Sequence, residues 1–311
     1  MKALVCGSLA YDTIMVFPER FRDHILSDQI HILNVCFLTP KLRREFGGCA
    51  GNISYNLKLL GGEPLPMATV GVDFEPYREH LGRLGISDRY VRVIDGAYTA
   101  QAFITTDIDD NQITAFHPGA MEHSGSNQVR DVEKVDIGIV APDANAAMRQ
   151  HSIHFAERGI PHIFDPGQAL PMFSADELLD FVDRADWITV NDYEGRLLAE
   201  RTGLSPRDIA CRTKAYIVTR GADGSEIHTP AGVTPIAPAR AECLTDPTGC
   251  GDAYRGGLLW GLVQGFELAD AARAGSLLGA LKIARQGPQN HTCTTDQFHE
   301  LFKENFGYRL E

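Results

Sequence analysis

Short apolar segments alternate with longer segments of helical character along most of the 311-residue chain, and this alternation constrains the fold most strongly. Several of the short segments are continuously apolar, which is typical of strands in a parallel sheet that helices cover on both faces. The predicted strands are 3–6, 67–70, 137–140, 162–164, 187–190 and 215–219. The predicted helices are 51–60, 77–84, 145–157, 175–185, 194–202, 251–264 and 268–285. We therefore predict a doubly wound α/β fold with a mostly parallel sheet, in which ligands bind at the carboxyl ends of the strands.

Two regions interrupt the alternation of strands and helices. Residues 13–46 and 95–118 contain β-like segments with their own alternation of polar and apolar side chains. We predict that these two regions form a small β-sheet lid. The lid would be inserted in a large α/β domain made of residues 1–12, 47–94 and 119–311.

Charge and cysteine usage exclude several classes of partner. A formal net charge of −12 repels nucleic acid and anionic membranes, so we expect neither as a partner. No run of about 18 apolar residues occurs, and the apolar run at the N-terminus is too short for a signal peptide. The seven cysteines are widely spaced and include no Cys-x-x-Cys, which argues against a zinc site. Their odd number fits a reducing compartment, so we expect a cytoplasmic protein.

The segment 246–252 reads Asp-Pro-Thr-Gly-Cys-Gly-Asp and is followed directly by an apolar run. Its glycines allow the backbone to approach a ligand, and the helix that follows offers unpaired N–H groups to a phosphate. Asp252 lies in the first turn of that helix, where it could accept a proton from a hydroxyl that attacks the phosphate. The structural alternative is that Asp252 only caps the helix.

A second glycine cluster reads Gly-Gly-Cys-Ala-Gly-Asn at 47–52 and precedes apolar residues at helical spacing. Paired glycines before a helix can form a hinge, and Asn52 can hydrogen-bond a hydroxylated ligand. The alternative is an ordinary turn.

Four motifs in a fixed order identify a resemblance. They are the cluster at 47–54, Asn-x-x-Glu at 191–194, the segment Thr-Arg-Gly-Ala-Asp-Gly at 219–224, and the segment 246–252. Over essentially its full length, the chain resembles the ribokinase family of sugar and nucleoside kinases, also called the phosphofructokinase-B family. Within this family it looks most similar to bacterial adenosine-kinase-like nucleoside kinases.

The resemblance assigns the transferring phosphate to the segment before the apolar helix. It implies that Asp252 is the base, and that the backbone N–H groups of Gly249, Cys250 and Gly251 form an anion hole. Cys250 also places a thiol at a helix N-terminus, where its pKa is expected to fall.

The resemblance also assigns the remaining binding roles. Asp12, expected at the end of the first strand, would hold two sugar hydroxyls together with Gly48 and Asn52. The donor ATP would contact Asn191, Thr219, Gly221 and Gly224. Glu194 would bind Mg²⁺ through water. Asp246 would border a site for a monovalent cation such as K⁺, although Pro247 replaces the family's usual threonine and stiffens this loop.

The acceptor is predicted from the aromatic residues of the lid. Phe103 and Phe116, with Gln101, are predicted to bind the flat base of a nucleoside. The alternative is that the aromatic residues in these regions, which include Tyr11, Phe17 and Phe37, form a small core of the lid itself.

We predict an ATP-dependent kinase that phosphorylates the 5′-hydroxyl of a purine nucleoside such as adenosine, inosine or guanosine. Two alternatives remain open at this point, namely a ribose or fructose kinase and a non-catalytic sugar or nucleoside sensor. A homodimer that pairs through the lid is compatible with the resemblance.

Overall fold

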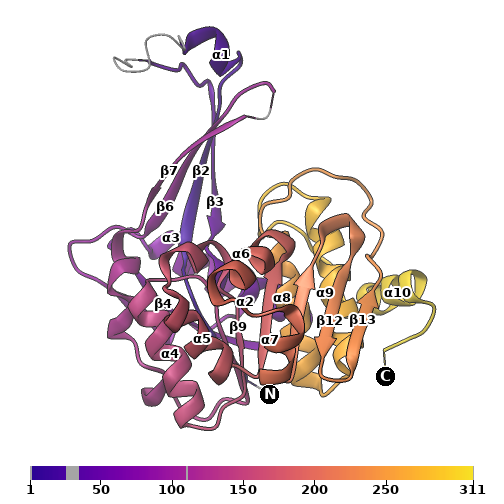
Figure 1. Ribbon diagram of the computed structural model, residues 1–311. Helices are drawn as coiled ribbons and strands as arrows, with labels where there is room; N and C mark the ends of the chain where they lie inside the picture. The colour runs from indigo at the N-terminus through magenta and orange to yellow at the C-terminus, as the bar shows by residue number, and fades with distance from the viewer. Residues whose placement is uncertain (1, 26–34, 110, 311) are drawn as a thin grey trace.

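The computed structural model describes residues 2–25, 35–109 and 111–310, and its largest element is a nine-stranded sheet. In spatial order the strands are β13, β12, β11, β10, β9, β8, β1, β4 and β5 (Figure 1). Their bounds are β1 Lys2–Cys6, β4 Glu63–Val70, β5 Tyr90–Val93, β8 Ile137–Val140, β9 His162–Phe164, β10 Trp187–Asn191, β11 Ala215–Thr219, β12 Ser225–Thr229 and β13 Gly232–Ile236. All neighbouring pairs are parallel except β11–β12 and β12–β13.

Helices cover both faces of this sheet, as the continuously apolar strands predict. The α-helices of this domain are α2 Cys49–Leu59, α3 Glu75–Leu84, α4 Asn145–Glu157, α5 Ala175–Arg184, α6 Asp192–Thr202, α7 Pro206–Arg212, α8 Cys250–Gln264, α9 Leu268–Ile283 and α10 Thr295–Phe306. The short 3₁₀ helices are η2 Gly119–Ser126, η3 Val129–Asp131, η4 Gly167–Met172 and η5 Gly221–Asp223. On β1, Ala3 and Val5 pack with α2, α8 and α9, whereas Leu4 and Cys6 pack with α4 and α5. The fold class predicted from the sequence is confirmed.

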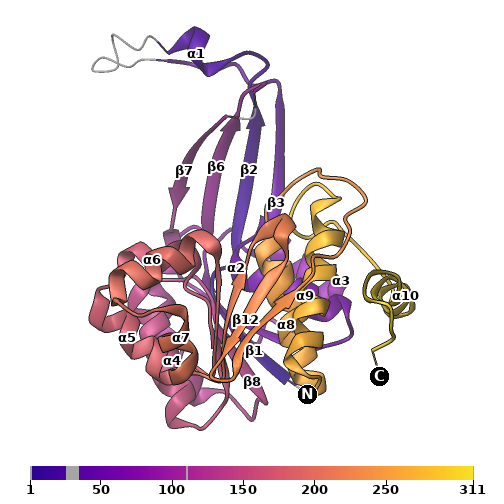
Figure 2. The ribbon, with the colours of Figure 1, turned by 45° about the vertical axis from the view of Figure 1, so that its right-hand side comes forward.

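A second sheet of four strands rises from the large domain (Figures 1 and 2). Its order is β3-β2-β6-β7, with bounds β2 Ala10–Val16, β3 Lys41–Gly47, β6 Ala100–Thr106 and β7 Gln112–His117. We call this sheet, together with the described residues that follow β2 and precede β3 and those that join β6 to β7, the lid. Asp12 lies in β2 of the lid and not at the end of the first strand, because the chain leaves β1 at Cys6 and becomes extended again at Ala10.

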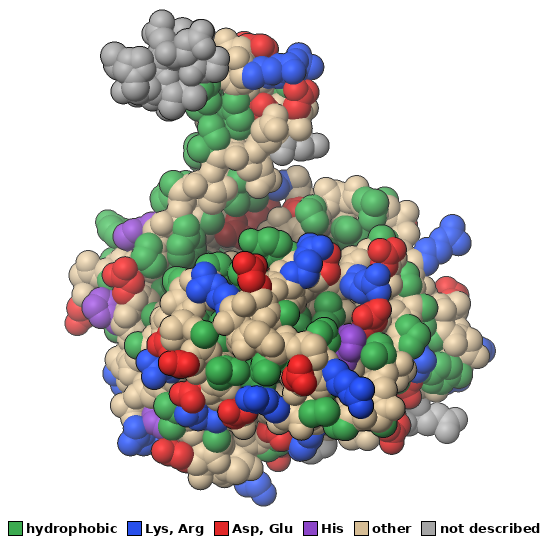
Figure 3. Space-filling model, viewed as in Figure 1, with side chains coloured by type: hydrophobic (Ala, Val, Ile, Leu, Met, Phe, Trp, Pro, Cys, Tyr) green, Lys and Arg blue, Asp and Glu red, His purple; other side chains and the backbone are tan. Residues whose placement is uncertain are grey.

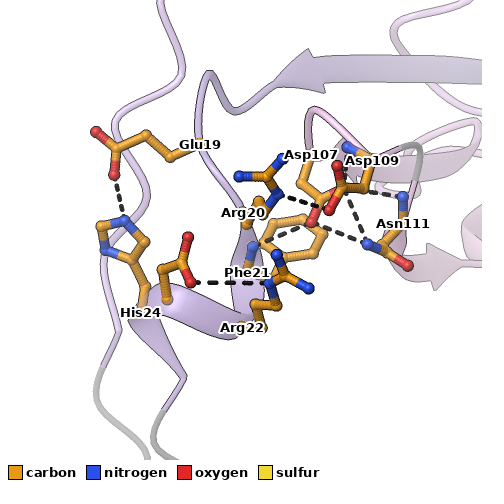
Figure 4. A network of polar contacts seen from close by, with 9 residues as sticks. Glu19, Arg20, Phe21, Arg22, His24, Asp107, Asp109 and Asn111 are labelled. Atoms are coloured by element: carbon orange, nitrogen blue, oxygen red, sulfur yellow. Dashed lines mark hydrogen bonds and ion pairs between the residues drawn. The ribbon is translucent and has the colours of Figure 1, made fainter.

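The far end of the lid has a small core of its own. There, Phe17 packs on Phe21 of α1 (Phe21–His24) and on Phe37, with ring centroids 5.8 and 4.7 Å apart. The backbone N–H of Phe21 donates to Asp107 over 3.0 Å, which joins α1 to the turn after β6 (Figure 4). For Phe17 and Phe37 the structure therefore supports the alternative reading, a core of the lid. Tyr11 is also buried, and its ring packs on Phe46 and Tyr77.

Candidate active site

A cavity of about 680 Å³ lies between the lid and the carboxyl ends of the parallel strands. Its walls include residues at or within two positions of the ends of β1, β8, β9, β10 and β11, namely Ser8, Pro142, Asp165, Asn191 and Thr219. Figure 3 shows the hollow beneath the lid, with acidic side chains inside it. This position and volume are those of a small-molecule site in an open α/β sheet.

The N-terminus of α8 forms part of the floor of this cavity. Gly249, the residue before the helix, has a φ of +79°, and a Cβ there would come within 2.7 Å of Pro288. Only glycine fits this backbone turn. Within the described residues, the N–H groups of Gly249 and Gly251 have no hydrogen-bond partner. The N–H of Cys250 donates to the carbonyl of Pro247 over 3.1 Å, so the prediction that it joins the anion hole is not met.

Asp252 faces the cavity from the first turn of α8 and is held by Asn52 of α2. The Asn52 Nδ2 donates to Asp252 Oδ2 over 2.8 Å, and Gln289 Nε2 donates to Asn52 Oδ1 over 2.9 Å. Burial raises the pKa of Asp252, while the Asn52 hydrogen bond and the nearby Arg255 guanidinium act against that rise. The carboxylate is therefore fixed in direction, and its proton affinity is increased.

Asp12 enters the cavity from the lid side. Burial, with the charges of Asp252 and Glu45, raises its pKa to about 6. Gly48 also lines the cavity; it has a φ of +84°, and a Cβ there would lie 2.5 Å from the carbonyl oxygen of Ser8.

The register of the lid separates the predicted base-binding residues. In the ladder, Asp12 pairs with Ala102 and Ala102 pairs with Phe116, so Phe116 shares the cavity face with Asp12. Gln101 and Phe103 pair with Tyr11 and Thr13 and point to the opposite face, because side chains alternate along a strand. A single chain does not bring Gln101 or Phe103 to the cavity, which corrects the prediction for both.

On the side predicted for ATP, the cavity is lined by Thr219, Gly221, Asn191 and Glu194. Asn191 and Glu194 form a capping box at the start of α6. The Asn191 N–H donates to Glu194 Oε2 over 2.7 Å, and the Glu194 N–H donates to Asn191 Oδ1 over 2.8 Å.

Gly224 is not among the residues that line the cavity. It has a φ of +82°, and a Cβ there would lie 2.1 Å from the carbonyl oxygen of Ile236 in β13. A glycine is therefore required at position 224 by the packing of the hairpin β12–β13, and Gly224 has no direct contact with the cavity.

Arg255 is a cavity residue that the sequence reasoning missed. Its side chain is buried, forms an ion pair with Asp165 and lies 3.7 Å from Glu194 Oε2. The sequence did offer a signal that could have identified this residue, because Arg255 is the one charged residue in the apolar run 253–262. A buried guanidinium between two carboxylates places positive charge beside the cavity of an acidic protein.

Two further predictions concern the pKa of Cys250, the first residue of α8, and the role of Asp246 in the turn before that helix. The pKa of the Cys250 thiol is not lowered by the helix N-terminus, because burial raises it to about 11. The Asp246 carboxylate accepts hydrogen bonds from the N–H groups of Thr248 and Gly287, both over 2.9 Å. Its oxygens thus join two loops.

Comparison with known proteins gives relatives over the full length of the chain. The structure of Burkholderia thailandensis nucleoside kinase in complex with inosine is 50% identical, with 99% of each chain covered and a TM-score of 0.90. A second structure of that enzyme, in complex with ADP-inosine, is 51% identical, with a TM-score of 0.88 and coverage of 99% of this chain and 97% of that one. The nucleoside kinase of Methanocaldococcus jannaschii is 29% identical over 308 residues, which is 98% of each protein.

None of the helices in the described ranges has the length and apolar character that a membrane span requires. The sequence pattern of pfkB family carbohydrate kinases matches residues 12–295. Because this match spans most of the chain and includes the cavity residues Asp12, Asn52, Glu194 and Asp252, the protein belongs to the pfkB family of carbohydrate kinases.

Proposed function

We propose that this protein is a nucleoside kinase that transfers the γ-phosphate of ATP to the 5′-hydroxyl of a purine nucleoside such as adenosine, inosine or guanosine. The observation that carries the proposal is the pair of opposed carboxylates in one cavity. Asp252 lies at the N-terminus of α8 and is held by Asn52, and Asp12 enters from the lid. The similarity to a nucleoside kinase with bound inosine supports the choice of acceptor.

Asp252 is proposed as the general base. The 5′-hydroxyl oxygen attacks the γ-phosphorus, the bond from that phosphorus to the ADP oxygen breaks, and Asp252 accepts the hydroxyl proton. The free N–H groups of Gly249 and Gly251 stabilise the negative charge on the transferring phosphoryl group. Both elements are present before substrate binds, so little reorganisation is needed during the reaction.

Asp12 is proposed to orient the nucleoside. An ionised carboxylate can accept hydrogen bonds from both hydroxyls of a ribose 2′,3′-diol. Phe116 and Met121 line the same cavity and offer an apolar surface for the base. Since Phe116 is 53% exposed, this surface is open on one side.

Mg²⁺ fits the oxygen-rich side of the cavity. Within the described residues, no group of three or more acidic, histidine or cysteine side chains could hold a metal alone. Mg²⁺ commonly keeps several waters and binds through one or two carboxylates together with substrate phosphates. Glu194 lines the cavity, and Asp165 Oδ1 is buried without a hydrogen-bond partner. When bound, Mg²⁺ would neutralise phosphate charge, while Glu194 and Asp165 would hold it directly or through water.

The test is ADP formation on a panel of adenosine, inosine, guanosine, ribose and fructose, with the product identified by mass spectrometry and ³¹P NMR. We expect turnover with at least one nucleoside and a 5′-monophosphate product. Turnover with ribose or fructose only would establish the sugar-kinase alternative. Binding of nucleosides without ADP formation would establish the sensor alternative.

A homodimer through the lid is a further part of the proposal. On the lid face away from the cavity, Leu42, Phe103 and Ile113 are 65%, 41% and 46% exposed. A second copy of the lid would cover these side chains. Sedimentation velocity should show a dimer that Phe103→Asp dissociates, and a wild-type monomer across the micromolar range would contradict this part.

A further inference from the structure

A buried ammonium group lies beneath the turn that precedes α8. Lys282, near the end of α9, has 0% exposure. Its Nζ donates to the carbonyl oxygen of Asp246 over 2.6 Å and to that of Arg285 over 3.1 Å. A buried charge is tolerated only when it is hydrogen-bonded, and here two backbone carbonyls accept from two of the three N–H donors of the ammonium.

The groups that act on the charge of Lys282 come from β3 and from the start of α8 with the turn before it. Asp246 and Cys250 near the start of α8 and Glu45 on β3 favour its charged form, whereas Arg43 on β3 opposes it. Burial is the largest influence and lowers the pKa of Lys282. Arg43 itself lies 3.9 Å from the Asp246 carboxylate, so the ammonium sits inside a network that includes the lid.

The two carbonyls that accept from Lys282 belong to two different loops. One loop, 245–249, leads into the anion-binding turn, and the other, 284–287, follows α9. The Gly287 N–H bond to Asp246 joins the same two loops. The N–H groups of Thr245 and Asp246 donate to the carbonyl oxygen of Ile283, the last residue of α9, over 2.8 and 3.1 Å. The ammonium therefore holds together the backbone that positions Gly249.

The residues at this position do not fit a bound monovalent cation. Such an ion would need the carbonyl oxygens of the two loops, and Lys282 already uses one from each. A lysine ammonium is a compact positive charge that attracts the same carbonyl oxygens. We propose that Lys282 takes the place of a monovalent cation in this chain, fixes the anion-binding turn from below, and makes the enzyme independent of K⁺.

The first test uses the wild-type protein. ADP formation with inosine and the midpoint of thermal unfolding are measured in KCl, NaCl and tetramethylammonium chloride at equal ionic strength. We expect both quantities to be unchanged across the three salts. A clear requirement of turnover for K⁺, or a melting midpoint that rises only in KCl, would overturn the inference. The melting readout does not depend on kinase activity, so it separates this inference from the proposed function.

The second test removes the ammonium. Lys282→Ala leaves the carbonyls and a vacant space, so we expect turnover in tetramethylammonium chloride to fall at least about tenfold, since a hydrogen-bonded charge is lost. KCl should restore much of that turnover and raise the melting midpoint of this variant. Lys282→Met fills the space without a charge and should show no recovery in KCl.

Lys58→Ala is the matched control, because Lys58 is a partly buried lysine of α2 outside the cavity, and its variant should resemble the wild type in every salt. The inference would be overturned if KCl changed neither the turnover nor the melting midpoint of Lys282→Ala. If Lys282→Ala does not fold, the wild-type salt series still decides the question.

Discussion

At the floor of the cavity, side chains far apart in the sequence hold one another through short hydrogen bonds, whereas the lid strand β7 is exposed along its whole length. Gln289, Asn52 and Asp252 form a chain of bonds of 2.9 and 2.8 Å between α2, α8 and the loop before α10. In the described part of the lid, the polar network of Asp107 lies at the end far from the cavity (Figure 4), and the face away from the cavity carries the exposed apolar side chains Leu42, Phe103 and Ile113.

This difference separates two tasks in one site. Groups that stabilise a transition state work best when they are already oriented, and a buried network on rigid helices provides that orientation. The lid must move to admit and release substrate, and such movement is easier for a single sheet with few buried contacts. The comparison therefore predicts large catalytic effects from changes in the floor and smaller binding effects from changes in the lid.

The largest effect is expected for Asp252→Asn. Loss of a general base should lower kcat by about 10²–10⁴, while calorimetry should show that ATP and nucleoside still bind. Asp192→Asn is a matched control, because Asp192 is also acidic and in the first turn of a helix, yet it is exposed. A variant that keeps more than about a tenth of the wild-type kcat would remove Asp252 from the role of base.

Asp12→Ala, on the lid side, should act mainly on the acceptor. Without a charged group to accept from the ribose diol, the binding free energy of the nucleoside should weaken by on the order of 1.5–3 kcal/mol, which corresponds to roughly 10–150-fold in affinity. Steady-state kinetics should show this as a higher nucleoside KM with little change in the KM for ATP. If ATP binding falls and the nucleoside KM stays constant, Asp12 serves a different site.

The raised pKa of Asp12 predicts a pH dependence of acceptor binding. Since this pKa is about 6 in the free protein, the carboxyl is largely protonated at lower pH and can no longer accept from both hydroxyls. The nucleoside KM should therefore rise about tenfold between pH 7 and pH 5, because one pH unit below the pKa leaves about a tenth of the group ionised. Asp12→Asn should abolish this dependence, and a wild-type KM that is flat from pH 5 to 7 would contradict it.

The same pKa shift has a defined sign for stability. The folded state binds the Asp12 proton more tightly than the unfolded state, so this group lowers the free energy of unfolding as pH rises from 3.8 to about 6.

The smallest effect is expected in the motion of the lid. Gly47 ends β3 and Gly48 precedes α2, and Gly48 already has a φ of +84°. We predict that the lid closes on nucleoside by hinging there, which would exclude water from phosphoryl transfer. Hydrogen exchange of β6 should slow with inosine and remain unchanged with ATP alone, while β10 serves as an internal control. Equal exchange in all states would mean that the lid is static and the glycines form only a turn.

Much of the fold was predictable because it is encoded locally. The strand Ile137–Val140 and the helix Asn145–Glu157 coincide with the predicted ranges, since each has a clear apolar pattern and a clear boundary. The glycines before α2 and α8 mark turns whose geometry excludes other residues, so their positions were also visible in the sequence.

The features that the sequence did not predict depend on which way a side chain points in the folded chain. Phe103 and Phe116 both lie in lid strands, and only the pairing register places one inside and the other outside. Burial of Cys250 reversed the expected direction of its pKa shift. Arg255 and Lys282 are long charged side chains whose burial depends on partners that are distant in sequence, such as Asp165 and Asp246.

The capping box at the start of α6 has a consequence for how this site can change over time. One oxygen of Glu194 accepts from the Asn191 N–H, so the same carboxylate helps to begin a helix and lines the cavity on the side proposed for the donor phosphates. A substitution at Glu194 that alters the phosphate side also removes one of the two reciprocal hydrogen bonds of the capping box, which leaves the Asn191 N–H without that partner. Variation at Glu194 is thus penalised through folding even in a descendant that no longer needs catalysis. A retained Asn-x-x-Glu in a related chain is for this reason weak proof of retained kinase activity, and Asp252, which no helix-capping bond holds in place, is the more informative residue to inspect.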